Sequence, residues 1–241
     1  MKTCSAFLAC AAGLVPLGAV AAESSAWKQQ FTAYMIGAAM DGSTTVGGIT
    51  APVDVSFSDI MDNLEFGAMA NYRAEKDRLS LNLDVIFMGL GFDGPNGRSA
   101  LDFDQIMVEG STGWRLSDNV EILGGARYNK LDGSVRLLDT EEPRSASQDK
   151  SWVDPFVGAW ARVPLSQSFA ILLRGDVGGF GVGSEMAYQF AGYLRYQTSG
   201  SVSIVAGWRY LDQDYEEGEG ARRFVYDVTT QGPVLGLGWH F

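Results

Sequence analysis

The chain contains the stretch Leu79-Ser80-Leu81-Asn82-Leu83-Asp84-Val85-Ile86-Phe87, in which every odd position is apolar and three even positions are polar. Because successive side chains of a strand point to opposite faces, this period of two predicts a β-strand with one apolar and one polar face. Residues 169–177 repeat the pattern and place Arg174 and Asp176 on the same face. Both stretches therefore predict sheet, with ions of both signs on its polar side.

The same alternation continues along almost all of the chain after residue 22. It predicts ten strands, near residues 27–40, 63–74, 79–92, 101–115, 119–131, 150–163, 169–180, 185–197, 201–212 and 223–241. Repeated segments of about ten alternating residues are typical of transmembrane β-barrels. We therefore predict an all-β fold in which these strands form one antiparallel barrel.

The connections between the predicted strands are alternately short and long. Tight polar turns fall at residues 75–77, 117–119, 166–168 and 198–200, and longer acidic or glycine-rich connections fall around 41–62, 93–100, 132–150, 181–184 and 213–222. Transmembrane barrels have this asymmetry, with short periplasmic turns and longer outer loops. Eight or twelve strands remain possible instead of ten, because segment 41–62 could form a loop hairpin or extend the first two strands.

The first 22 residues have the order of a secretory signal peptide. Met1-Lys2-Thr3 supplies a basic start, residues 6–20 are apolar, and Ala21-Ala22 supplies the small residues before a cleavage site. A membrane anchor is the weaker alternative, because the apolar run contains two glycines and a proline and is shorter than a spanning helix. We predict a signal peptide over residues 1–22 and an outer-membrane barrel domain over residues 23–241.

Composition excludes several classes of function. Both cysteines, Cys4 and Cys10, lie within the predicted signal peptide, which excludes a disulfide framework or a thiolate metal site in the barrel domain. A lipid-modified Cys10 is a poor alternative, because too little apolar sequence precedes it. The formal net charge of −11 disfavours nucleic-acid binding, which requires clustered cations. We expect no nucleic-acid partner.

The polar face of the predicted strands carries ions of both signs. In a soluble barrel these ions would face water, whereas in a membrane barrel they face the lumen. We predict a lumen charge network formed by Asp84, Glu109, Glu121, Arg127, Asp154, Arg162, Arg174, Asp176, Arg195 and Arg209. Because a barrel of eight to ten strands is nearly filled by its own side chains, paired ions that fill the lumen are favoured over a selective pore.

Aromatic residues near the strand ends support the membrane interpretation, because amphipathic rings settle at lipid headgroups. In the last predicted strand, Leu235, Leu237, Trp239 and Phe241 share one face. A final strand that ends in phenylalanine resembles the C-terminal signature of bacterial outer-membrane proteins, which implies recognition by the barrel-assembly machinery. We therefore predict that Trp239 and Phe241 form an assembly signal.

Four segments carry a wider resemblance, namely residues 152–158, 174–183, 207–211 and 232–238. Through them the chain resembles a family of largely uncharacterised proteobacterial outer-membrane β-barrel proteins, broadly like the small barrel of outer membrane protein A. The resemblance implies a location in the outer membrane of a Gram-negative cell. It implies no substrate and no catalytic residues.

The sequence offers little material for catalysis. Barrel enzymes such as omptin-type proteases and lipid A deacylases use a histidine, and the only histidine here is His240, at the periplasmic end. Residues 178–183 do not fit the spacing of a phosphate-binding glycine loop, and residues 212–219 lack the spacing of a calcium loop. We therefore expect no catalytic residues, no cofactor and no metal site.

These observations favour a structural or surface-interaction barrel with a charge-paired and largely plugged lumen. The alternative is a narrow porin-like channel for small polar solutes or ions, which the sequence hardly separates from the first hypothesis. The expected partners are outer-membrane lipids, lipopolysaccharide and the assembly machinery. We expect a monomer.

Overall fold

The computed structural model of the chain describes residues 26–46, 49–93, 99–137 and 144–241. The predicted signal peptide, residues 1–22, lies outside the described residues. The elements are β1 (Lys28–Ile36), β2 (Ala39–Val46), β3 (Ile49–Val55), α1 (Phe57–Asn63), β4 (Leu64–Lys76), β5 (Leu79–Asp93), β6 (Ser99–Ser117), β7 (Val120–Leu137), β8 (Arg144–Pro164), β9 (Phe169–Gly179), β10 (Met186–Gln197), β11 (Val202–Glu217), η2 (Gly220–Arg222) and β12 (Phe224–His240). In this part of the chain, no helix is long and apolar enough to cross a membrane.

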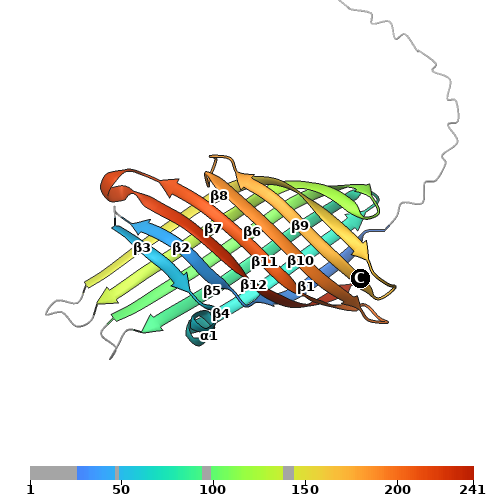
Figure 1. The fold of residues 1–241 in the computed structure, drawn as a ribbon, viewed down its shortest axis with the longest axis horizontal. Helices are drawn as coiled ribbons and strands as arrows, with labels where there is room; N and C mark the ends of the chain where they lie inside the picture. Colours follow the sequence, from blue (N-terminus) through green and yellow to red (C-terminus); the bar gives the residue numbers. More distant parts are fainter. Residues whose placement is uncertain (1–25, 47–48, 94–98, 138–143) are drawn as a thin grey trace, which may run out of the picture.

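Ten of the strands close into an antiparallel barrel (Figure 1). Strands β4 to β12 pair in sequence order, and β1 pairs with both β4 and β12. The barrel closes at β1, where Phe31 lies opposite Tyr72 of β4 on one side and Trp239 of β12 on the other. The predicted ten-stranded antiparallel barrel is confirmed.

Segment 41–62 forms part of the wall and a short helix. The predicted first strand, 27–40, is interrupted at Gly37 and Ala38, where the chain passes from β1 into β2. Strand β2 pairs with the outer half of β12, and β3 pairs with β2, so this hairpin continues the wall beyond the end of β1. Helix α1 then begins at a capping box, in which Ser56 and Asp59 satisfy each other's backbone N–H groups.

The longest strands are about twice the length that a bilayer requires. Strands β6, β7 and β8 contain 19, 18 and 21 residues, whereas a spanning strand needs roughly 9–11. The predicted loop at 132–150 was therefore too long, because β7 and β8 occupy most of it. The predicted loop at 213–222 was also too long, because β11 continues to Glu217. The sequence reading missed these extensions because their acidic residues suggested a solvated loop.

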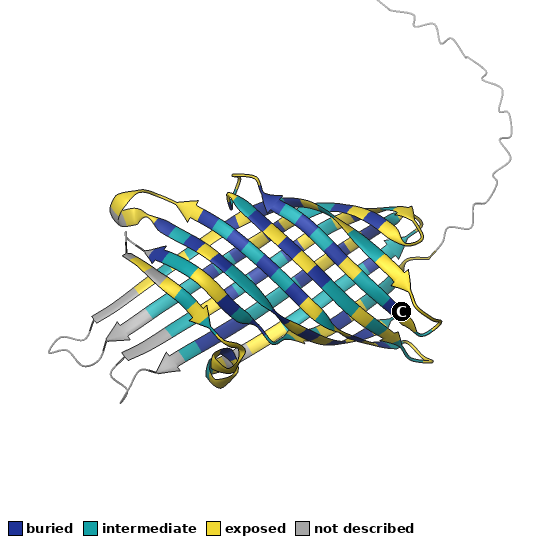
Figure 2. Cartoon of the chain, viewed as in Figure 1, coloured by how far each residue is buried: buried dark blue, intermediate teal, exposed yellow. Residues whose placement is uncertain are grey.

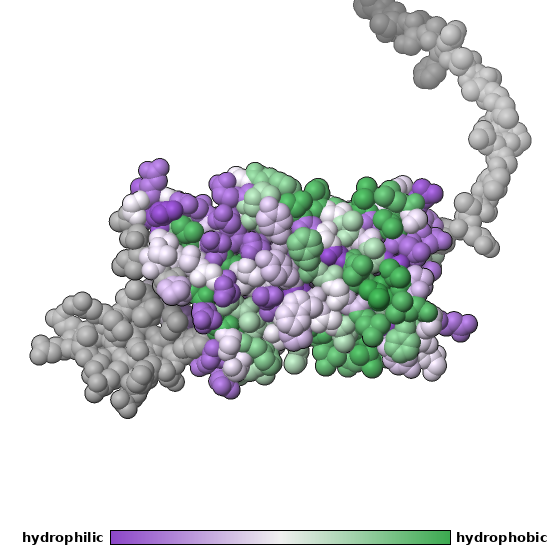
Figure 3. All heavy atoms as spheres, viewed as in Figure 1, coloured by the Kyte–Doolittle hydropathy of each residue, from purple (hydrophilic) through white to green (hydrophobic). Residues whose placement is uncertain are grey.

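The barrel has the polarity of a membrane protein. Large apolar side chains point outward and are exposed, among them Leu81, Leu83, Ile122, Val157, Leu173, Leu194, Leu235 and Leu237. Buried and exposed residues alternate along the strands (Figure 2), and on the face drawn in Figure 3 apolar side chains gather on the half that bears the short turns. A closed barrel with an apolar outer band and ions inside satisfies every backbone group within lipid. The chain is an outer-membrane β-barrel.

The interior of the outer half contains an apolar core, which the sequence analysis did not predict. Its core consists of Ala38, Met40, Ile60, Met88, Leu90, Leu131, Trp152, Tyr215, Phe224, Tyr226 and Val228. The rings of Trp152 and Tyr215 stack with their centroids 4.2 Å apart. The lumen thus contains an apolar core where the barrel extends beyond the apolar outer band, and ionic side chains where that band surrounds it.

Candidate functional site

Four charged side chains meet at the centre of the lumen. Arg127 Nη2 on β7 lies 2.9 Å from Glu109 Oε2 on β6 and 2.9 Å from Asp176 Oδ1 on β9. Arg174 Nη2 on β9 lies 2.6 Å from Glu109 Oε1 and 2.8 Å from Asp176 Oδ2. Each arginine bridges the same two carboxylates. The four groups therefore form a ring of alternating charge, in which the side chains of Glu109, Arg127 and Asp176 have no exposed surface.

The ring continues across the barrel through neutral and charged partners. Gln189 Nε2 donates to Asp176 Oδ2 at 2.9 Å, and Gln189 Oε1 accepts from Arg209 Nε and Nη2 at 2.9 and 2.6 Å. Arg209 Nη1 lies 2.8 Å from Asp84 Oδ2, and the Tyr34 hydroxyl donates to Asp84 Oδ1 at 2.9 Å. We call the six ions of this connected set the charge belt: Asp84, Glu109, Arg127, Arg174, Asp176 and Arg209.

Strand register brings the belt to one level. Asp84 lies opposite Glu109 in the β5–β6 pair, and Glu109 lies opposite Arg127 in the β6–β7 pair. The belt has three cations and three anions, so the buried charges compensate one another, as ions withdrawn from water must. The guanidinium groups of Arg127 and Arg174 also lie 5.2 and 5.4 Å from the centre of the Phe156 ring, a favourable cation–π geometry.

Asp154 lies closer to the outer end than the belt and is bound by neutral donors. Its carboxylate accepts hydrogen bonds from the Trp152 indole at 3.0 Å, the Asn129 amide at 3.1 Å and the Gln213 amide at 3.4 Å. It also accepts from the Ser184 backbone N–H at 2.6 Å and the Ser184 hydroxyl at 3.0 Å. Ser184 belongs to the β9–β10 connection, so Asp154 holds that turn inside the mouth of the barrel. It is not charge-paired as the sequence predicted, since no cation lies within ion-pair distance among the described residues.

A second ionic cluster lies toward the short turns. Arg73 pairs with Glu121 at 2.6 Å and with Glu75 at 2.7 Å, and Arg115 pairs with the other oxygen of Glu75 at 2.6 Å. The Ser80 hydroxyl donates to Glu121 at 2.7 Å. This cluster is less buried than the belt, because Glu75 and Arg115 keep about a third of their side-chain surface exposed.

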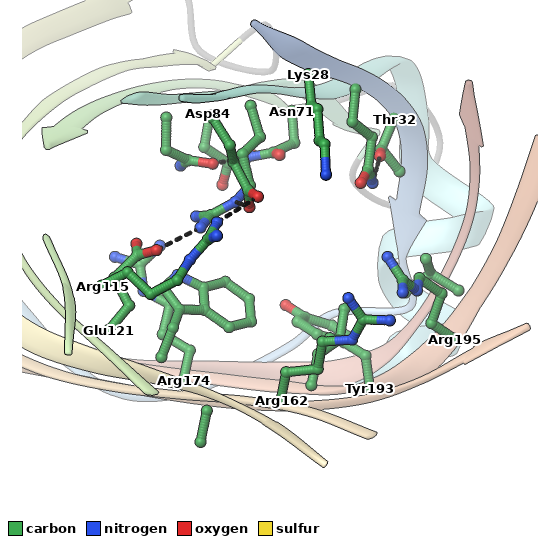
Figure 4. Close-up of a pocket in the computed structure, with 18 of the residues that line it drawn as sticks. Lys28, Thr32, Asn71, Asp84, Arg115, Glu121, Arg162, Arg174, Tyr193 and Arg195 are labelled. Carbon is green, nitrogen blue, oxygen red and sulfur yellow. Dashed lines mark hydrogen bonds and ion pairs between the residues drawn. The ribbon is translucent and has the colours of Figure 1, made fainter. Parts of the chain in front are cut away.

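A cavity of about 410 Å³, which we call the turn-end cavity, lies between the belt and the short turns (Figure 4). Asp84, Arg174 and Arg209 of the belt line its inner end. Lys28 and Asn119 line the other end, where the short turns lie. The belt therefore separates this cavity from the apolar outer half of the lumen.

The structure places all ten predicted network residues on the inner side of the wall. Six form the belt, Glu121 joins the second cluster, and Asp154 holds the outer turn. Arg162 and Arg195 line the cavity.

Several lumen residues were missed by the sequence analysis. Tyr34 and Gln189 link the two halves of the belt but are uncharged, and Glu75 and Arg115 complete the second cluster. Strand parity was the available signal for Gln189 and Arg115, which share the inward faces of β10 and β6 with Arg195 and Glu109.

The C-terminal residues belong to the closing seam. The Trp239 ring points outward and stacks on Phe31 at 6.0 Å. Phe241 exchanges two backbone hydrogen bonds of 3.0 Å with Gln29, and its own side chain is exposed. His240 points inward, and its Nε2 lies 2.9 Å from the Ser203 hydroxyl. Among the described residues, no group of three or more histidine, cysteine or acidic side chains could hold a metal ion.

No protein-family model and no curated protein matches the sequence. Ail, the attachment invasion locus protein of Yersinia pestis, has a similar structure, with 13% identity over 89% of this chain and 98% of that chain and a TM-score of 0.42. A FadL homologue of Pseudomonas aeruginosa has 10% identity over 89% of this chain and 90% of its own, with a TM-score of 0.41. The translocator domain of the autotransporter NalP from Neisseria meningitidis has 11% identity over 91% and 90%, with a TM-score of 0.41. These likenesses concern barrel architecture and say nothing of activity.

Proposed function

We propose that this protein is a non-conducting outer-membrane barrel with a structural or surface-interaction role. The observation that supports this most directly is the charge belt, in which Glu109, Arg127 and Asp176 are fully buried and joined by ion pairs of 2.6–2.9 Å. A solute crossing the lumen would have to separate these ions in a low-dielectric interior. Separating one partner of a buried pair costs about 3–5 kcal/mol.

Two further features of the outer half support a sealed lumen. The Asp154 cluster holds the β9–β10 connection in the outer mouth, and the apolar core around Trp152 fills the outer half of the barrel. With the lumen sealed, the outer ends of β6, β7 and β8 are among the parts available to other molecules. We propose that these extensions, together with outer-membrane lipids and lipopolysaccharide, make the protein's contacts, that the barrel acts as a monomer, and that it carries out no catalysis.

Conductance tests the sealed lumen. The mature protein, refolded and shown to be folded by heat-shifted gel mobility, is expected to give no discrete channels in a planar bilayer. A porin measured in the same bilayers shows that channels would be detected. Steady, discrete channels would overturn the proposal and favour the narrow channel, for which the turn-end cavity would be one half of the path.

Surface labelling tests the outward extensions. The predicted mature chain has no cysteine, so the labelling of a single introduced cysteine can be measured without background from native cysteines. Ser147→Cys in β8 is expected to react with a membrane-impermeant maleimide on intact cells. The control is Ser199→Cys, an exposed residue of the β10–β11 turn, which is expected to react only after cell lysis. The reverse labelling would place the short turns outside and contradict the proposed orientation.

A further inference from the structure

The turn-end cavity has an excess of positive charge, although the chain as a whole carries −11. Its lining includes seven cationic and four acidic side chains: Lys28, Arg73, Arg115, Arg162, Arg174, Arg195 and Arg209, against Glu75, Asp84, Asp118 and Glu121. A concave site with one dominant sign of charge and walls of low dielectric concentrates counter-ions. The cavity is therefore the part of the lumen best suited to an anion.

Three of these cations have no carboxylate of their own. Arg73 and Arg115 pair with Glu75 and Glu121, while Arg174 and Arg209 belong to the belt. The remaining three are Lys28, Arg162 and Arg195. Across residues 26–46, 49–93, 99–137 and 144–241, none of the three has an acidic group within ion-pair distance.

Strand register explains why Arg162 and Arg195 are unpaired. Arg162 of β8 lies opposite Leu172 of β9, and Arg195 of β10 lies opposite Ala170 of β9. The inward positions of β9 between the two arginines are thus apolar. The next two inward positions along β9 are Arg174 and Asp176, which pair within the belt. No residue of the intervening strand can neutralise the two arginines.

The two guanidinium groups lie near each other in the cavity. Figure 4 shows Arg162 and Arg195 side by side, with Lys28 reaching into the lumen from another part of the wall. Arg162 repels Arg195 electrostatically, while the more distant Glu75 attracts it without reaching ion-pair distance. Like charges held together on a rigid wall are relieved by an anion that bridges them, and guanidinium groups bind oxyanions through parallel N–H donors.

We propose that this cavity binds a phosphate group from the periplasmic side, bridged by Arg162 and Arg195 and faced by Lys28. Three cations match the double negative charge of a phosphate better than the single charge of a carboxylate. A volume of about 410 Å³ holds a phosphate with a small organic group attached. Because the belt closes the inner end, the anion is bound and not passed across the membrane, so the site is independent of what the outer end contacts.

Calorimetric titration of the refolded mature protein with inorganic phosphate, at constant low ionic strength, tests the site. Saturable binding with one site per chain is expected. The double variant Arg162→Gln with Arg195→Gln is expected to weaken binding roughly tenfold or more, since each arginine contributes charge-assisted hydrogen bonds. The matched control is Arg222→Gln with Arg223→Gln, which removes the same two charges from exposed positions at the outer end, and it should bind as the parent protein does.

A soluble short-chain phosphatidic acid, titrated in the same way, distinguishes the source of the phosphate. Competition between this lipid and inorganic phosphate indicates a site that recognises the phosphate group alone. Binding of the lipid only, lost in the double variant, supports the same site with a lipid headgroup as its ligand. No binding of either probe, or equal binding by the parent protein and a double variant with normal heat-shifted mobility, would overturn the proposal.

Discussion

Replacing Glu109 by Gln removes one negative charge from the centre of the belt without changing the side chain's size. Glu109 has no exposed surface and lies 2.9 Å from Arg127 and 2.6 Å from Arg174. After the substitution, Asp176 would be the remaining carboxylate for both arginines. Leaving a buried charge without its partner costs about 3–5 kcal/mol.

The assay is urea unfolding of the protein refolded into lipid vesicles, followed by tryptophan fluorescence. Glu109→Gln is expected to lower the free energy of unfolding by about 3–5 kcal/mol. The control Glu75→Gln, in the partly exposed cluster near the short turns, should lower it by only about 1 kcal/mol or less. Adding Arg127→Met to Glu109→Gln restores the charge balance and should recover part of the loss. A Glu109→Gln barrel within about 1 kcal/mol of the parent would refute the belt as a stabilising plug.

Three other changes have separate readouts. Asp154→Ala removes the acceptor of five hydrogen bonds and should release the β9–β10 turn, seen as new protease cleavage near Ser184 on intact cells, while unchanged protection would contradict the capping role. The pKa of Asp59 is lowered by hydrogen bonds from Ser56, so their stabilisation of α1 is present above the ordinary aspartate pKa of 3.8 and is lost as the pH falls through the lowered value. Faster amide exchange in α1 on acidification would show this, and the effect should be smaller in Ser56→Ala, which loses the hydroxyl donor but keeps the backbone donor. Phe241→Ala keeps both backbone bonds to Gln29, so the refolded barrel should keep its stability while less of it reaches the outer membrane of cells. Equal amounts in the membrane would argue against an assembly signal.

The belt illustrates what strand parity can and cannot predict. Alternation placed Asp84, Glu109 and Arg127 on one face, because the side-chain period of a strand is a local property. Parity does not say which ions meet. Arg127 lies directly opposite Asp154 in the β7–β8 pair, yet it bonds to Glu109 and to Asp176, which lies two strands away. That choice depends on the stagger of all ten strands around a narrow lumen.

The apolar outer interior illustrates a second limit. Trp152, Tyr215 and Phe224 face inward and pack together, although inward positions were expected to be polar. A local pattern cannot distinguish an aromatic ring that faces lipid from one that faces a lumen extending above the membrane. The distinction depends on how far each strand continues beyond the bilayer, and β7, β8 and β11 continue further than their acidic residues suggested.

By itself, the sequence determined the ten barrel strands apart from their outer ends, the alternation of short and long connections, and the ions that share the polar face, because strand periodicity and turn composition depend on neighbours within about ten residues. Only the tertiary structure decided the division of the first strand at Gly37, the pairings within the belt, and the two arginines left without a carboxylate. These depend on register between strands that are far apart in the chain, and no local period encodes that register.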